Sequence, residues 1–161
     1  MKWWMTILIG LWTLAAEAQT TGDSVVVAED VCFFTASGSI QRLSGLPHDR
    51  LTLLVLYDSE CKDCRQLLFA LRHSSVVGQR VGEGLLQVLA VDVGGNRELT
   101  RQVQQELPTT WLTALLQSDI SKSRLYDTSA VPMLYLLDAD RRVMLVDNDT
   151  QTLQTILTQL W

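Results

Sequence analysis

The sequence predicts an α/β sandwich, with a central mixed sheet, helices on both of its faces and an N-terminal β-hairpin. Two nearly continuous apolar runs, Leu51 to Tyr57 and Leu85 to Val93, are typical of strands covered on both faces. Each run is followed by a segment with helical periodicity, and a third such segment ends the chain. Strands that alternate with helices form parallel pairs, so we expect a right-handed crossover between the two central strands.

The N-terminal residues predict a signal peptide. Lys2 precedes an apolar run from Trp3 to Ala15, and Ala16-Glu17-Ala18 fits a small-x-small cleavage site. The run is shorter than the roughly 20 apolar residues that a membrane-spanning helix needs. We therefore expect residues 1–18 to be removed, no stable membrane anchor after cleavage, and a periplasmic or secreted mature protein.

Residues 19–50 are expected to form a short polar lead and the hairpin, and residues 51–161 the main domain. Val31 to Phe34 and Ile40 to Leu43 are strand-like and flank the turn signal Ser37-Gly38. Gly45-Leu46-Pro47 then ends the hairpin.

Two internal helices are predicted by their periodic residues. The first follows Tyr57 and carries on one face Cys61, Cys64, Leu68 and Leu71. The second is capped by Asn96 and ends at Pro108, and its expected buried residues are Leu99, Val103 and Leu107.

The remaining segments are less uniform. Residues 109–129 are the least regular part, with a weak helical pattern through Ile120 and Leu125. Met133 to Asp138 and Val143 to Val146 are predicted strands around a tight turn at Asp140-Arg141. A final helix, capped by Asp149, is predicted from its apolar positions Leu153, Ile156, Leu157 and Leu160.

The Cys61-Lys62-Asp63-Cys64 segment carries the candidate chemistry. Both cysteines lie in the first turn of a helix that directly follows a buried strand. The unpaired N–H groups and positive potential of a helix start favour a thiolate there. Our hypothesis is that Cys61 attacks a substrate disulfide and that Cys64 resolves the mixed disulfide.

The cysteines allow other interpretations. A C-x-x-C pair is also half of a zinc site, but the other Cys and His residues are only Cys32, His48 and His73. His73 lies roughly 13 Å along the helix axis from Cys64, which leaves only Cys32 and His48 to complete a site, so we expect no metal site. No cofactor is expected either. A purely structural Cys61–Cys64 disulfide stays open. Cys32 is most simply a buried free thiol, with a regulatory bond to the pair as the alternative.

The chain resembles thioredoxin-like domains of the TlpA/ResA kind, from about Val31 to its end. The residues that carry the resemblance are the Cys61–Cys64 motif and the Ala130-Val131-Pro132 step into the following strand. The segment from Leu107 to Asp127 is similar to small exported thioredoxin-like proteins of Bacteroidetes. The resemblance implies that Pro132 is cis and faces the cysteines, and that the Val131 backbone binds the substrate chain; a trans proline that opens a strand is the alternative.

Four positions depart from that family. Glu60 stands where a tryptophan is common, and Met133 stands where a threonine usually follows the proline. The two positions that hold acids in related proteins are Val55 and Leu67. The sequence therefore shows no evident proton acceptor for Cys64.

The expected function is that of an exported thiol–disulfide oxidoreductase. It would exchange disulfides with protein thiols through Cys61 and Cys64 and depend on an unidentified redox partner. The carboxylates of Asp58, Glu60 and Asp63 oppose a negative sulfur, which favours the reducing direction. The net charge of −5 and the lack of a basic cluster argue against a nucleic-acid partner. The alternative is a non-catalytic peptide-binding module with an inert disulfide.

Overall fold

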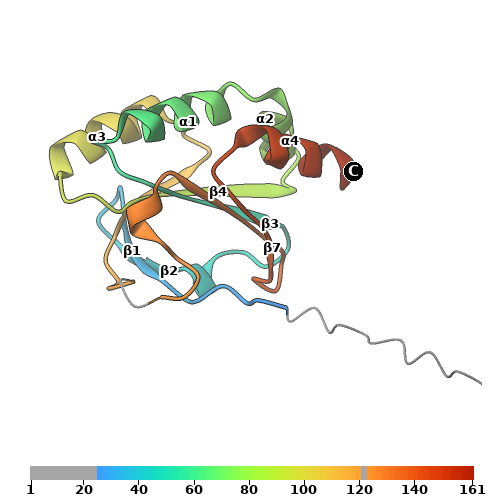
Figure 1. Cartoon of the computed structure of the whole chain (residues 1–161), viewed down its shortest axis with the longest axis horizontal. Coiled ribbons are helices and arrows are strands. Elements are labelled where there is room, and N and C mark those ends of the chain that lie inside the picture. The colour runs from blue at the N-terminus through green and yellow to red at the C-terminus, as the bar shows by residue number, and fades with distance from the viewer. Residues whose placement is uncertain (1–24, 121–122) are drawn as a thin grey trace, which may run out of the picture.

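A computed structural model describes residues 25–120 and 123–161 of the chain (Figure 1). The predicted signal peptide, residues 1–18, and the polar lead up to residue 24 lie outside the described residues. Within those two ranges, no helix has the length and apolar character needed to cross a membrane.

Seven strands form one mixed sheet in the order β2-β1-β5-β4-β3-β6-β7. Their bounds are β1 Cys32–Thr35, β2 Ile40–Arg42, β3 Leu51–Tyr57, β4 Leu86–Asp92, β5 Leu112–Leu116, β6 Met133–Leu137 and β7 Val143–Asp147. The pairs β3–β4 and β4–β5 are parallel, and the other pairs are antiparallel. The predicted mixed sheet and N-terminal hairpin are therefore confirmed.

The four α-helices of residues 25–120 and 123–161 gather on one face of the sheet (Figure 1). They are α1 Lys62–Arg72, α2 Ser75–Gly82, α3 Arg97–Glu106 and α4 Thr150–Gln159. The crossovers from β3 to β4 and from β4 to β5 step in the same direction across the sheet. Because such crossovers share one hand, their helices lie on the same face.

The second face is covered without any α-helix among the described residues. Its apolar cluster is closed by the segment before β1, by Leu43 of a short 3-10 helix and by the chain between β5 and β6. The 3-10 helices are η1 Leu43–Gly45 and η2 Thr128–Ala130. The α/β sandwich is confirmed. Helices were predicted on both faces of the sheet, whereas the α-helices of the described residues all pack on one face.

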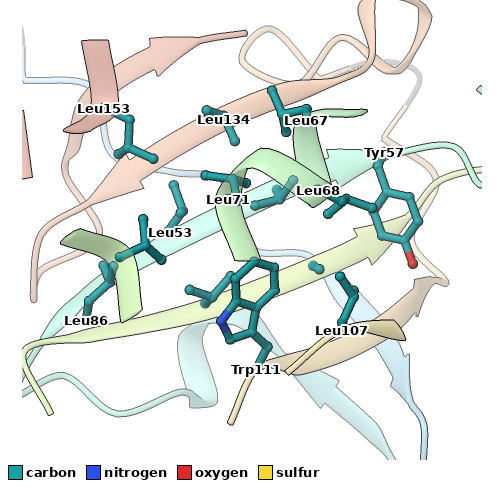
Figure 2. Packing of buried hydrophobic residues seen from close by; sticks show 14 of the residues in the cluster. Leu53, Tyr57, Leu67, Leu68, Leu71, Leu86, Leu107, Trp111, Leu134 and Leu153 are labelled. Carbon is teal, nitrogen blue, oxygen red and sulfur yellow. The ribbon is translucent and has the colours of Figure 1, made fainter. Parts of the chain in front are cut away.

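Alternating residues of the central strand build both cores. Leu53, Val55 and Tyr57 point toward the helices, where they join the cluster drawn in Figure 2. Leu54 and Leu56 point toward the other face. All five side chains are buried, as expected for a strand with a layer on each side.

Two elements differ from the sequence prediction. Residues 112–116 form strand β5 between β1 and β4, where only a weak helical pattern was expected. The ladder partners on either side hold this segment extended, and no local pattern encodes those partners. Helix α2 was not predicted because it is short and buries only Val77; Ser74 caps it by accepting a hydrogen bond from Val77 N.

Candidate active site

Cys61 is the N-cap of α1. Its backbone is extended, and its sulfur accepts a hydrogen bond from Cys64 N at 3.2 Å. Thiol sulfur thus takes the place of the hydroxyl or carboxylate oxygen that caps many helices. The Cys61 sulfur is partly exposed at the positive end of the helix, the position that the attacking thiol was predicted to hold.

Cys64 lies one turn further on and is fully buried. The backbone N–H of Asp58 donates a hydrogen bond to Cys64 Sγ at 3.4 Å. Burial raises the pKa of the Cys64 thiol well above its ordinary value, the Asp58 N–H opposes that rise, and Cys61 and the Asp58 charge add to it. Both cysteines are free thiols in the structure. The two cysteines therefore differ: the Cys61 sulfur is accessible, whereas the Cys64 thiol is buried and has a raised pKa.

Asp92 holds the loop in front of α1. It is the last residue of β4, is fully buried, and lies beside Tyr57 in the parallel register. Its carboxylate accepts hydrogen bonds from Gly94 N at 2.8 Å, Ser59 N at 3.4 Å and Thr100 Oγ1 at 2.7 Å. One carboxylate thus joins the cysteine loop, the turn after β4 and helix α3. Asp92 was not among the residues predicted from the sequence, although an acid that ends an apolar strand before Gly-Gly is a usable signal.

Gly94 leaves room for two carboxylates. A Cβ atom at this position would lie 2.6 Å from Asp58 Oδ1 and 3.1 Å from Asp92 Oδ1. Asp58 Oδ1 also accepts a hydrogen bond from Glu60 N at 2.8 Å, which keeps this side chain folded over its own loop. A larger residue at position 94 would displace the Asp58 carboxylate.

Tyr57 lies under α1, at one end of the cluster in Figure 2. Its hydroxyl is buried and has no hydrogen-bond partner within the described part of the chain. Burial raises the pKa of Tyr57 above its ordinary value, and the charges of Asp92 and then Cys64 raise it further. The hydroxyl therefore lies within electrostatic reach of both groups.

The Val131–Pro132 peptide bond is cis, as the resemblance implied. It precedes β6, whose Met133 pairs with Leu56 near the end of β3. Pro132 consequently lies at the end of the sheet from which the cysteine loop leaves. Val131 and Cys61 both pack against the apolar cluster that contains Cys64. Cys61, Cys64 and Val131 thus share one apolar cluster, and Pro132 precedes β6 at the same end of the sheet.

The other candidate residues lie elsewhere. Cys32 is in β1, which is separated from β3 by β5 and β4. At about 4.8 Å between strands, it is roughly 14 Å away across the sheet, beyond the ~7 Å between Cα atoms that a disulfide allows. His48 and His73 bond to backbone carbonyl groups. In the described ranges, no three Cys, His, Asp or Glu residues form a group that could hold a metal ion.

No family model matches this chain, and no curated protein shows significant similarity to it. Solved structures similar to this chain were found. A conserved protein of unknown function from Bacteroides fragilis is 32% identical and superposes with a TM-score of 0.73; the match covers 81% of this chain and 96% of that one.

Two further solved structures have a similar fold. A thioredoxin-like protein from Bacteroides caccae is 28% identical with a TM-score of 0.75; the match covers 83% of this chain but only 48% of that one. The thioredoxin domain of a thiol-disulfide oxidoreductase from Bacteroides vulgatus is 17% identical with a TM-score of 0.70, and the match covers 84% and 95% of the two chains. At that identity the likeness concerns the fold alone.

Proposed function

The chain belongs to the thioredoxin-like family of thiol–disulfide proteins from Bacteroides and its relatives, and from this premise we propose that it reduces disulfides in exported proteins. Cys61 is the attacking thiol and Cys64 the resolving thiol. The substrate is a protein disulfide, and a separate redox partner returns the Cys61–Cys64 disulfide to the dithiol. No metal or organic cofactor takes part.

The placement of Cys61 at the start of α1, directly above the buried Cys64, carries this proposal. The accessible sulfur attacks first because it lies at the helix start, where N–H groups stabilise negative charge. Cys64 attacks second, from one turn deeper. The cis Val131–Pro132 step, which precedes β6 near the end of β3, supports a role for the Val131 backbone in holding an extended substrate chain.

Export is proposed from the N-terminal sequence. Lys2, the apolar run after it and Ala16-Glu17-Ala18 support a signal peptide and a periplasmic or secreted location. We propose that residues 1–18 are removed and that residues 19–50 extend a main domain of residues 51–161.

An insulin-reduction assay with dithiothreitol tests the activity. The Cys61→Ala/Cys64→Ala variant is the negative control, and Cys32→Ala is the matched control because Cys32 lies three strands from β3. Wild type and Cys32→Ala are expected to reduce insulin at equal rates, well above the double variant. Equal rates for all three proteins would leave only the alternative, a peptide-binding module with an inert disulfide.

The roles of the two sulfurs are tested separately. In a Cys64→Ser variant the mixed disulfide cannot be resolved, so mass spectrometry should find the substrate bound to Cys61. A substrate trapped on Cys64 in a Cys61→Ser variant, with none on Cys61, would reverse the assigned roles.

The reducing direction is tested by equilibration with a glutathione buffer. Asp58, Glu60 and Asp63 surround the helix start with negative charge, and Cys64 is buried, so a thiolate gains little stabilisation. We expect a potential nearer that of thioredoxin, about −270 mV, than that of DsbA, about −120 mV. A value above roughly −180 mV would contradict this direction.

A further inference from the structure

The buried Cys64 needs a route for its proton. To resolve a mixed disulfide, Cys64 must attack as a thiolate, yet its thiol is fully buried and its pKa is raised. The positions that hold acids in related proteins are Val55 and Leu67 here. A different part of the chain must therefore accept the proton.

We propose that the carboxylate of Asp58 is the proton acceptor for Cys64, and that Gly94 and Asp92 hold it in position. This inference rests on the proposed thiol–disulfide exchange. The Asp58 backbone N–H donates a hydrogen bond to Cys64 Sγ at 3.4 Å, and the charge of the Asp58 carboxylate acts on the Cys64 thiol, so the two residues are direct neighbours. Asp58 is half-buried, so a proton that it accepts can pass on to solvent.

The carboxylate is held on two sides. Asp58 Oδ1 accepts the Glu60 N–H at 2.8 Å, and the missing side chain of Gly94 gives that oxygen its space. Asp92 fixes Gly94 and Ser59 through their N–H groups. Gly94 and Asp92 are thus positioning residues.

Four ionisable groups surround this path. Tyr57 from β3 and Cys61 from α1 face Cys64, Asp58 reaches it from the loop, and Asp92 from β4 faces Asp58 across Gly94. The Tyr57 hydroxyl, whose pKa is raised, stays protonated at neutral pH. Asp92 already accepts three hydrogen bonds. Asp58 is therefore the acceptor that combines a free carboxylate oxygen with contact to the reacting residue.

The step balances as an ordinary exchange. Asp58 takes the proton of the Cys64 thiol, and the Cys64 thiolate attacks Cys61 Sγ in the mixed disulfide. The Cys61–Cys64 bond forms while the bond from Cys61 to the substrate sulfur breaks. The substrate sulfur leaves as a thiolate and takes a proton from Asp58 or from water. The cysteine pair is oxidised by two electrons and the substrate disulfide is reduced.

Stopped-flow reaction of the reduced protein with one equivalent of 2,2′-dithiodipyridine tests the proposal, in a Cys32→Ser background that leaves two thiols. The first pyridinethione reports attack by Cys61, and the second reports resolution by Cys64. We expect Asp58→Asn to leave the first phase within about twofold and to slow the second by at least about tenfold at neutral pH. The amide still offers an oxygen to Glu60 N, so the loop geometry is kept.

The pH profile separates proton transfer from a structural role. Without its acceptor, the second phase of Asp58→Asn should rise about tenfold per pH unit, because hydroxide must remove the proton, whereas the wild-type profile is flatter. Gly94→Ala should slow the same phase by displacing Asp58. Glu60→Gln is the charge control and should change neither phase by more than about twofold, because its side chain bonds Asn96 instead.

The sign of the effect is decisive. The Asp58 charge itself disfavours a Cys64 thiolate, so an Asp58 that acted only through its charge would make Asp58→Asn resolve faster. A second phase that is unchanged or faster in Asp58→Asn overturns the proposal. A wild-type protein that shows no second phase at all overturns the exchange function itself, which is a distinguishable result.

Discussion

At the scale of single residues, the Tyr57 hydroxyl links the site to the alkaline stability of the fold. Burial first, and then the charges of Asp92 and Cys64, raise the pKa of Tyr57 above its ordinary value of 10.0. A raised folded-state pKa means that the protonated form is favoured by folding. The stability that comes with it is fully present below pH 10.0 and is lost as the pH rises above that value.

Tyr57→Phe should therefore make the protein less sensitive to alkali. Because the lost hydroxyl has no partner in the described residues, the variant should lie within about 1 kcal/mol of wild type at neutral pH. Above about pH 10, its free energy of unfolding should fall less steeply than that of wild type. Urea unfolding at both pH values measures this.

Tyr126→Phe is the matched control for that measurement. The Tyr126 hydroxyl donates to Glu29 O at 2.7 Å, so this variant should already lose about 1 kcal/mol at neutral pH. If Tyr57→Phe and wild type lost the same stability in alkali, the electrostatic account of Tyr57 would be wrong.

At the scale of elements, Asp92 joins three segments through one buried carboxylate. Asp92→Ala leaves the N–H groups of Ser59 and Gly94 without their acceptor, while Thr100 Oγ1 keeps Asn96 O. We expect a loss of about 2–4 kcal/mol in the free energy of unfolding. Thermal and urea denaturation measure this loss, and Asp63→Ala, at an exposed position, is the control. A loss below about 0.5 kcal/mol would show that the hydrogen bonds to Asp92 do not stabilise the fold.

The turn between β6 and β7 is tied to β3 by Arg141. Its φ is 63°, and its buried guanidinium donates to Thr52 Oγ1 and Leu46 O, both at 2.7 Å. Arg141→Ala should cost about 2–4 kcal/mol in urea unfolding, because Leu46 O loses its donor and Thr52 Oγ1 keeps only Gln87 Nε2. Arg141→Gly should remain destabilised although glycine suits the φ value. The exposed Arg142→Ala should stay within about 0.5 kcal/mol of wild type, and an equal loss in both alanine variants would contradict the role assigned to the buried side chain.

For the whole molecule, features that depend on nearby residues could be predicted from the sequence. Features that depend on which strands pair could not. Some predictions depend on residues only a few positions apart: the cysteine roles, the helix caps Asn96 and Asp149, and the buried strand Leu51–Tyr57. The structure contains the two capped helices and the strand. Strand β5 and the Asp92 contacts depend on which strands become neighbours. Loop closure and sheet register decide such pairings, and neither leaves a short-range pattern in the sequence.

The redox state should change the stability of the whole domain. In the reduced form, the buried Cys64 faces the Asp58 carboxylate and the Tyr57 hydroxyl, so this form gains little from thiolate stabilisation. When the folded protein does not stabilise the dithiol form, it favours the Cys61–Cys64 disulfide. By linkage, the oxidised protein then has a larger free energy of unfolding than the reduced protein. We expect the oxidised form to be more stable by about 1–3 kcal/mol, the opposite order from DsbA, whose reduced form is stabilised. Urea unfolding with and without reductant measures the difference.

The Cys61→Ala/Cys64→Ala variant controls for effects of the reductant and should unfold identically in both conditions. Cys32→Ser should keep the wild-type difference, because Cys32 lies three strands away from β3. If the reduced protein proved more stable than the oxidised one, the site would have to stabilise a thiolate strongly. That order would place the protein on the oxidising side, since about 30 mV of potential corresponds to about 1.4 kcal/mol for a two-electron couple.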